Sequence, residues 1–212
     1  GYCFQMEREG KTILLAKRDG SNIVESNLGC CEEPDLSFVR FGIWIMFGIT
    51  LAPLGAIAIH SSVVVKDGGA VLCLGESGTG KSTHTRLWRE HIDGAFLLND
   101  DSPFLRVEDG KVWAYGTPWS GKTPCYKQER YELVGCVRLS QAPLNRISKL
   151  SALHAYASLM PSCSCLRWDS EATRMLHETV ETVISKVGVW SLECLPDKGA
   201  ARVCREACNG KI

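Results

Sequence analysis

The sequence lacks a net charge, because its 24 lysine and arginine residues equal its 24 aspartate and glutamate residues. Such a balance gives no overall field to recruit nucleic acid or an anionic membrane, so we expect neither as a partner. Internal repeats, low-complexity tracts and long linkers are also lacking. The 212 residues, 45% of them hydrophobic, therefore suit one ordinary globular domain with a small appendage.

A basic stretch with an apolar core is lacking after the first residues, so we expect no signal peptide in this sequence. One uncharged run, residues 41–59, is long enough to cross a bilayer. Pro53 and Gly55 interrupt it. We interpret it as an apolar helix to about residue 51, a turn and a buried strand, and we expect a cytoplasmic chain without a membrane span.

Eleven cysteines are many, but they lack the pattern of a disulfide scaffold or a zinc site. Their number is odd, and the chain is long for a small secreted scaffold. Cys73 and Cys136 lie in apolar stretches and are typical of small core residues. Cys163 and Cys165 form the nearest thing to a ligand pair, without a second pair at zinc-finger spacing. We expect reduced, intracellular thiols.

The sequence does contain a complete phosphate-binding motif, Gly-x-x-x-x-Gly-Lys-Ser, at residues 75–82. Residues 71–74 before it predict a buried strand, and residues 82–90 after it predict a helix. Glycines let backbone N–H groups surround phosphate oxygens, while Lys81 reaches the phosphates and Ser82 binds Mg²⁺. The motif predicts ATP or a similar polyphosphate as ligand. The expected nucleotide-binding residues are Gly75, Glu76, Ser77, Gly78, Thr79, Gly80, Lys81, Ser82 and Thr83.

A second motif lies at residues 94–101, which predict a buried strand ending in Asp100 and Asp101. Nucleotide enzymes place an acid at such a strand end, where it holds Mg²⁺. Neighbouring residues of a regular strand point to opposite faces. At an irregular end, however, both carboxylates would face the cleft and supply a metal ligand and a general base. The alternative is a solvated strand-to-loop turn.

Around these motifs the sequence predicts an α/β fold: a mixed-sheet P-loop nucleotide-binding domain flanked by helices. Residues 1–37 form an N-terminal flank of antiparallel strands, and residues 38–212 form the catalytic domain. A strand at 56–65, a turn and a strand at 70–74 follow one another without the crossover helix of a doubly wound sheet. His84 and His91 on the helix after the loop are expected at the surface.

Three stretches together resemble the HPr serine kinase/phosphorylase catalytic domain and, more broadly, the phosphoenolpyruvate carboxykinase-like fold. They are Ile59-His60-Ser61, residues 75–83 and Asn99-Asp100-Asp101, and the resemblance extends over about residues 38–208. It implies that Asp100 is the general base on the acceptor hydroxyl and that Asp101 lies nearer the metal. It also implies that His60 lies close to the phosphates, although a hydrogen-bonded core histidine is the alternative. Family members assemble as homo-oligomers, but no residue here identifies such an interface.

The loop at residues 116–124 does not match the glycine-rich signature of that family, so we do not expect HPr itself as the substrate. Trp119 and Lys122 in this loop are candidates for contact with the acceptor, while packing over the sheet edge is the alternative for Trp119. We predict an ATP- and Mg²⁺-dependent kinase for a hydroxyl of an unidentified protein, peptide or small molecule. A carboxykinase-like metabolic enzyme and a non-catalytic nucleotide-binding regulatory module are the alternatives.

Overall fold

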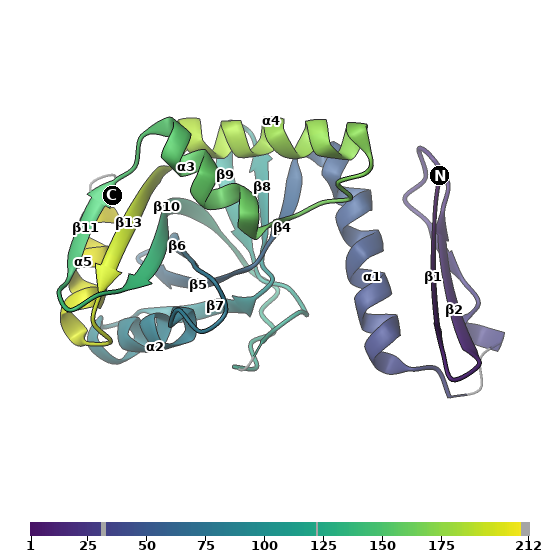
Figure 1. Ribbon diagram of the computed structural model, residues 1–212, viewed down its shortest axis with the longest axis horizontal. Helices are drawn as coiled ribbons and strands as arrows, with labels where there is room; N and C mark the ends of the chain where they lie inside the picture. The colour runs from purple at the N-terminus through teal and green to yellow at the C-terminus, as the bar shows by residue number, and fades with distance from the viewer. Residues whose placement is uncertain (31–32, 122, 209–212) are drawn as a thin grey trace. The chain divides into compact units, whose positions relative to one another are not determined.

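The computed structural model describes residues 1–30, 33–121 and 123–208. The chain forms two compact units, Gly1–Pro53 and Leu54–Ile212 (Figure 1). The sequence suggested a division after residue 37 instead. The structure groups the apolar helix with the N-terminal strands because that helix packs on them.

The N-terminal unit is a small antiparallel sheet with one helix. Its elements are β1 (Tyr2–Arg8), β2 (Lys11–Lys17), β3 (Val24–Ser26), η1 (Leu28–Cys30) and α1 (Leu36–Leu51). Asp35 caps α1 by accepting hydrogen bonds from the backbone N–H groups of Ser37 and Phe38. Gly42 allows the close approach of helix and sheet, because a Cβ there would lie 2.3 Å from Leu15 Cδ1. The antiparallel strands expected from the sequence are therefore present.

Residues Leu36–Leu54, mainly α1, are long and apolar enough to span a membrane by length and composition. Their mean hydropathy is 1.6, and 11% of the stretch is buried within the structure. The order of helix, turn and strand agrees with the sequence interpretation, since η2 (Ala52–Leu54) and β4 (Ala56–Ile59) follow directly. The absence of a membrane partner stays a prediction.

The C-terminal unit is built on a mixed sheet, as the sequence predicts. Its strands are β4, β5 (Ser61–Lys66), β6 (Gly69–Leu74), β7 (Phe96–Asp101), β8 (Phe104–Glu108), β9 (Lys111–Tyr115), β10 (Arg130–Gln141), β11 (Arg146–Lys149), β12 (Cys163–Ser164) and β13 (Gly188–Cys194). The order along the sheet is β12-β4-β8-β9-β10-β6-β5-β7, with β13 between β10 and β11. β10 runs parallel to β6 and β13, whereas β5 runs antiparallel to both β6 and β7.

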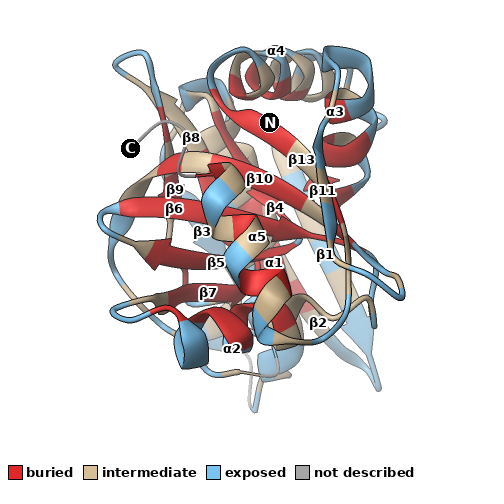
Figure 2. Ribbon diagram, turned by 90° about the vertical axis from the view of Figure 1, so that its left-hand side faces the viewer, coloured by how far each residue is buried: buried red, intermediate tan, exposed pale blue. Residues whose placement is uncertain are grey.

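Helices cover both faces of this sheet (Figure 1). They are α2 (Lys81–His91), α3 (Ala152–Leu159), η3 (Met160–Ser162), α4 (Ser170–Lys186) and α5 (Lys198–Cys208). One apolar cluster joins the sheet to α3 and α4 through residues such as Leu159 and Val180. A second cluster joins it to α2 and α5 through Trp88 and Cys204. The buried strands lie between these clusters (Figure 2).

The cysteines of the described residues are free thiols. Cys73 and Cys136 are fully buried, as their apolar surroundings predict, and burial raises the pKa of both thiols. Burial also raises the pKa of Cys163 to about 12. In the described part of the chain no group of three or more histidine, cysteine or acidic side chains is arranged to hold a metal ion.

Candidate functional site

The glycine-rich loop, residues 75–80, connects the buried strand β6 to helix α2. Gly80 precedes the first residue of α2 with a φ of 102°, which favours glycine. Gly75 has a φ of 155°, and a Cβ there would lie 2.3 Å from Thr79 Oγ1. The loop therefore needs glycine at both ends to turn tightly into the helix.

Lys81 begins α2 and folds its ammonium back over the loop. Nζ donates to the carbonyl oxygens of Gly75 at 2.7 Å and Glu76 at 3.3 Å. Burial lowers the pKa of Lys81, while nearby carboxylates act in the opposite direction. The ammonium thus occupies a position from which it can turn to a phosphate oxygen.

Asp100 lies beside the loop at the end of β7 and is 3% exposed. Its Oδ1 accepts from Ser62 Oγ at 2.6 Å and from Ser82 Oγ at 3.1 Å. Its Oδ2 lies 3.3 Å from Ser82 Oγ and accepts from the backbone N–H of Thr123 at 3.2 Å. Both oxygens of this carboxylate are therefore fixed by neighbours, and one neighbour is the serine of the predicted Mg²⁺ site.

Asp101 is half exposed, and its carboxylate, like that of Asp100, lies close enough to Lys81 to act on its pKa. Its φ is 157°, a value that non-glycine residues rarely adopt. Oδ1 lies 3.3 Å from His60 Nδ1, and His60 Nε2 lies 3.1 Å from Lys81 Nζ. Because an ammonium can only donate, His60 Nε2 accepts and its proton is on Nδ1, facing Asp101. His60 therefore links the lysine of the loop to the second acid.

Residues 116–121 and 123–125 lie beside the acids and are fixed there by hydrogen bonds. Asn99 Nδ2 donates to Thr117 Oγ1 and to the Trp119 carbonyl, each at 3.1 Å. The N–H of Gly121 donates to the Asp100 carbonyl at 2.5 Å. Trp119 lies against Phe104, with ring centroids 6.4 Å apart. Lys122, the other predicted acceptor contact, lies outside the described residues.

The structure therefore brings His60, Lys81, Ser82 and both acids together, although these residues come from one strand, one helix and the residue between β4 and β5. It turns the side chain of Glu76 away from the loop interior, toward Arg138. Arg138, Ser62 and Asn99 were not predicted. For Arg138 a signal was available, because it is the only charge in the apolar run of residues 133–139.

The oxygen atoms of Ser82 and Asp100 fit a hard divalent cation. Mg²⁺ prefers hydroxyl, carboxylate and phosphate oxygens, and it usually binds through one or two carboxylates together with substrate phosphates. Two protein ligands are thus what a Mg²⁺–nucleotide complex needs.

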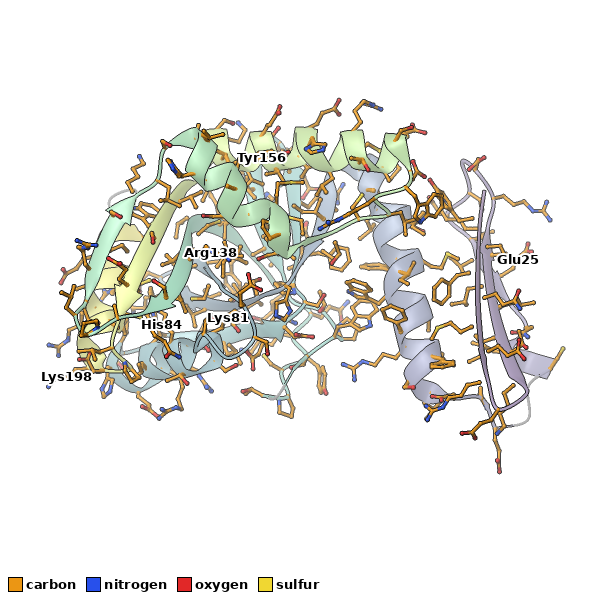
Figure 3. The ribbon with its side chains drawn as sticks, viewed as in Figure 1. Glu25, Lys81, His84, Arg138, Tyr156 and Lys198 are labelled. Carbon is orange, nitrogen blue, oxygen red and sulfur yellow. The ribbon has the colours of Figure 1, made fainter. Side chains whose placement is uncertain are left out.

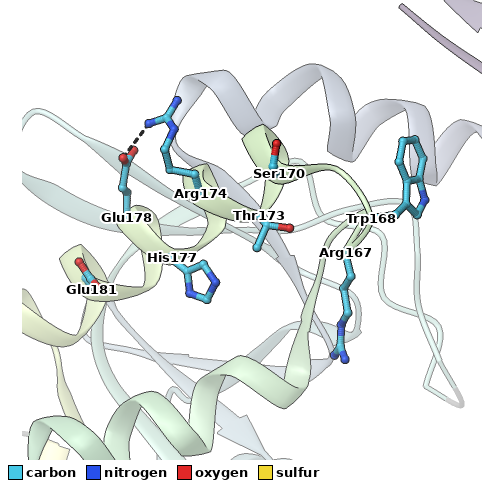
Figure 4. A pocket seen from close by; sticks show the side chains of 8 residues that line it. All are labelled: Arg167, Trp168, Ser170, Thr173, Arg174, His177, Glu178 and Glu181. Atoms are coloured by element: carbon cyan, nitrogen blue, oxygen red, sulfur yellow. Dashed lines mark hydrogen bonds and ion pairs between the residues drawn. The ribbon is translucent and has the colours of Figure 1, made fainter.

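A separate hollow of about 480 Å³ lies over the first turns of α4 (Figure 4). It contains the ion pair of Arg174 with Glu178, whose N–O distance is 2.7 Å. None of the residues that line it belongs to the glycine-rich loop or to β7. The lining residues are Arg167, Trp168, Ser170, Thr173, Arg174, His177, Glu178 and Glu181.

Fold and site together describe a mixed α/β protein with a glycine-rich loop between a strand and a helix and with two acids beside it. No protein-family model and no curated protein sequence matches the chain. Among the solved structures that resemble it is the Hpr(Ser) kinase/phosphatase from Coxiella burnetii, at 14% identity and a TM-score of 0.40. The match covers 72% of this chain and 94% of that one. The activity of this chain is therefore inferred from its own site.

Proposed function

We propose that this chain is an ATP-dependent phosphotransferase that moves the γ-phosphoryl group to a hydroxyl of a protein, peptide or small molecule. One observation carries the proposal: the loop and the acids are joined by direct contacts. Ser82 Oγ donates to Asp100 at 3.1 Å. His60 lies between Lys81 and Asp101. Phosphoryl transfer depends mainly on positioning and charge neutralisation, which this arrangement provides.

The backbone N–H groups of the glycine-rich loop and the N-terminus of α2 would hold the phosphates, and Lys81 would turn from its carbonyl partners to their oxygens. Ser82 and Asp100 would hold Mg²⁺. When bound, this cation neutralises charge on the phosphates. The burial of Asp100 keeps its carboxylate fixed for that task.

We further propose roles for the two acids that reverse those implied by the family resemblance. Both oxygens of Asp100 are already engaged, by Ser62, Ser82 and Thr123. Asp101 is the more accessible acid, with a side chain 43% exposed. Asp101 therefore accepts the proton of the acceptor hydroxyl as its oxygen bonds to the γ-phosphorus and ADP leaves with the bridging oxygen. His60 positions Asp101 by donating from Nδ1.

Residues 116–121 and 123–125 would form the wall of the acceptor site, because they touch the acid-bearing strand β7 directly. Gly121 is in contact with Asp100. A role for Trp119 and Lys122 in binding the acceptor stays part of this proposal.

The test compares Asp101→Asn with Asp100→Asn. Calorimetry measures the affinity for Mg²⁺–ATP, and phosphate release from ATP, with water as the acceptor, measures turnover. We expect Asp101→Asn to lose about 100-fold or more in turnover while its nucleotide affinity stays within about twofold. Asp100→Asn should instead lose the Mg²⁺ dependence of ATP binding. Asp109→Asn, in the turn between β8 and β9, is the matched control.

Four outcomes would contradict these statements. If Asp100→Asn binds Mg²⁺–ATP normally and loses turnover while Asp101→Asn keeps it, the reversed roles are wrong. If the wild-type protein does not bind ATP, the whole proposal fails. Tight ATP binding without turnover or transfer to any hydroxyl would identify a regulatory module, whereas formation of phosphoenolpyruvate from oxaloacetate would identify a carboxykinase-like enzyme.

A further inference from the structure

We infer that Arg138 is a further phosphate-binding residue, held at the glycine-rich loop by Glu76 and transferred to the phosphate chain when a nucleotide binds. This inference rests on the proposed nucleotide-binding function and adds a residue to it. Arg138 lies on β10, in parallel register with Leu74 of β6, the residue before Gly75. Its Cα is therefore beside the strand end from which the loop begins.

The guanidinium of Arg138 touches the loop directly. Nη2 lies 2.9 Å from Glu76 Oε1, and Nη1 donates to the Ser158 carbonyl of α3 at 3.1 Å. Lys81 Nζ donates to the carbonyl of the same Glu76 at 3.3 Å, so both cations approach one loop residue. Figure 3 shows Arg138 and Lys81 at this end of the sheet. Arg138 comes from β10, whereas the acids come from β7 on the other side of β6 and β5.

The charges of the site explain why Arg138 should leave Glu76 for the phosphates when a nucleotide binds. Lys81 lies near three carboxylates, those of Glu76, Asp100 and Asp101, and Arg138 is paired with the first of them. A polyphosphate adds further negative charge beside Glu76, whose side chain is 76% exposed and can move into water. The side chain of Arg138 is only 28% exposed and stays at the loop. Guanidinium donors form forked, charge-assisted hydrogen bonds with phosphate oxygens, so the phosphates replace the carboxylate.

A purely structural role for the pair makes a different prediction. If Arg138 and Glu76 only tied the loop to α3, removing either partner would loosen the loop and weaken nucleotide binding. If Glu76 instead holds Arg138 away from the phosphates and repels them, removing Glu76 strengthens binding. The two single variants therefore have opposite effects only when Arg138 binds phosphate.

The experiment measures binding of Mg²⁺–ATP and of inorganic tripolyphosphate by calorimetry. We expect Arg138→Gln to weaken both by about tenfold or more, and Arg138→Lys to lose less. We expect Glu76→Gln to bind both severalfold more tightly. Arg86→Gln and Glu90→Gln are matched controls, because they remove an exposed ion pair on α2 with an N–O distance of 3.0 Å. Both should bind as the wild type does.

Unchanged binding by a folded Arg138→Gln, or weakening by Glu76→Gln, would overturn the inference. Thermal melting checks that each variant folds. If Arg138→Gln does not fold, the nucleotide affinity of Glu76→Gln tests the inference by itself. Lys81→Met separates this inference from the proposed function. If Lys81→Met abolishes binding and Arg138→Gln does not change it, the nucleotide site stands and only the role of Arg138 is wrong.

Discussion

Acid should destabilise this protein through one buried histidine, His84 on α2. The sequence suggested a surface position, but His84 is 3% exposed because it lies on the face of α2 that packs on the sheet. Its Nε2 accepts from Trp88 Nε1 at 3.1 Å. Since the indole can only donate, the proton of the neutral imidazole is on Nδ1, which has no hydrogen-bond partner. Burial lowers the pKa of His84 to about 4.

The sign and size of the effect follow from this pKa. Between the ordinary histidine pKa of 6.5 and about 4, the unfolded chain binds a proton at His84 that the folded chain does not. The free energy of unfolding therefore falls as the pH falls through this window, by about 1.4 kcal/mol per pH unit. Over the whole window the loss is about 3 kcal/mol, a large share of the stability of a typical domain.

Urea denaturation between pH 7 and pH 4 tests this prediction. His84→Gln lacks the titrating group. The slope of its free energy of unfolding against pH should therefore be smaller than the wild-type slope, by an amount that corresponds to nearly one bound proton. The slope is compared rather than the absolute stability, because the substitution itself changes packing. His91→Gln, at the exposed end of the same helix, should keep the wild-type slope. Equal slopes for wild type and His84→Gln would refute the reasoning.

Two further substitutions test how the acids are supported. Gly121→Ala should lower turnover while sparing nucleotide binding, because its Cβ would lie 2.7 Å from the Asp100 carbonyl oxygen and push Gly121 off the strand. Normal turnover would contradict this. Gly48→Ala, with open space around its Cβ, is the control. Thr117→Val should lower the free energy of unfolding in urea by about 1–3 kcal/mol, since it leaves the buried amide of Asn99 with fewer partners. Thr117→Ser keeps the hydroxyl and should lose less, and an equal loss in both variants would mean that the methyl group matters more.

Local patterns in the sequence were enough to predict the loop and the mixed sheet. The motif at residues 75–82 fixes a strand, a turn and a helix by its own residues, and the short turn before β6 excludes a crossover helix. The positions of the two acids were harder, because alternation along a strand places neighbours on opposite faces. Both acids nevertheless act on Lys81, and Asp101 has an unusual φ of 157° at this strand end, which no residue type in the sequence predicts.

Non-local pairing explains what the sequence could not predict. Arg138 reaches the loop because β10 pairs with β6, from which it is separated by more than fifty residues. His84 shares the buried face of α2 with Trp88, which belongs to an apolar cluster that also contains Cys204 of α5. In both cases the contact joins elements that are far apart in the sequence, so the residues near either element do not predict it.

The antiparallel position of β5 is what assembles the site. β5 lies between β6 and β7 and runs opposite to both, so its first residues meet the carboxyl ends of its two neighbours. Ser62 is opposite Asp100 in this register, and His60 directly precedes the strand. A β5 parallel to its neighbours would carry its last residues, Val65 and Lys66, to that edge instead. The inserted strand therefore supplies the hydroxyl that fixes Asp100, and it positions the preceding residue, His60, whose imidazole joins Asp101 to Lys81.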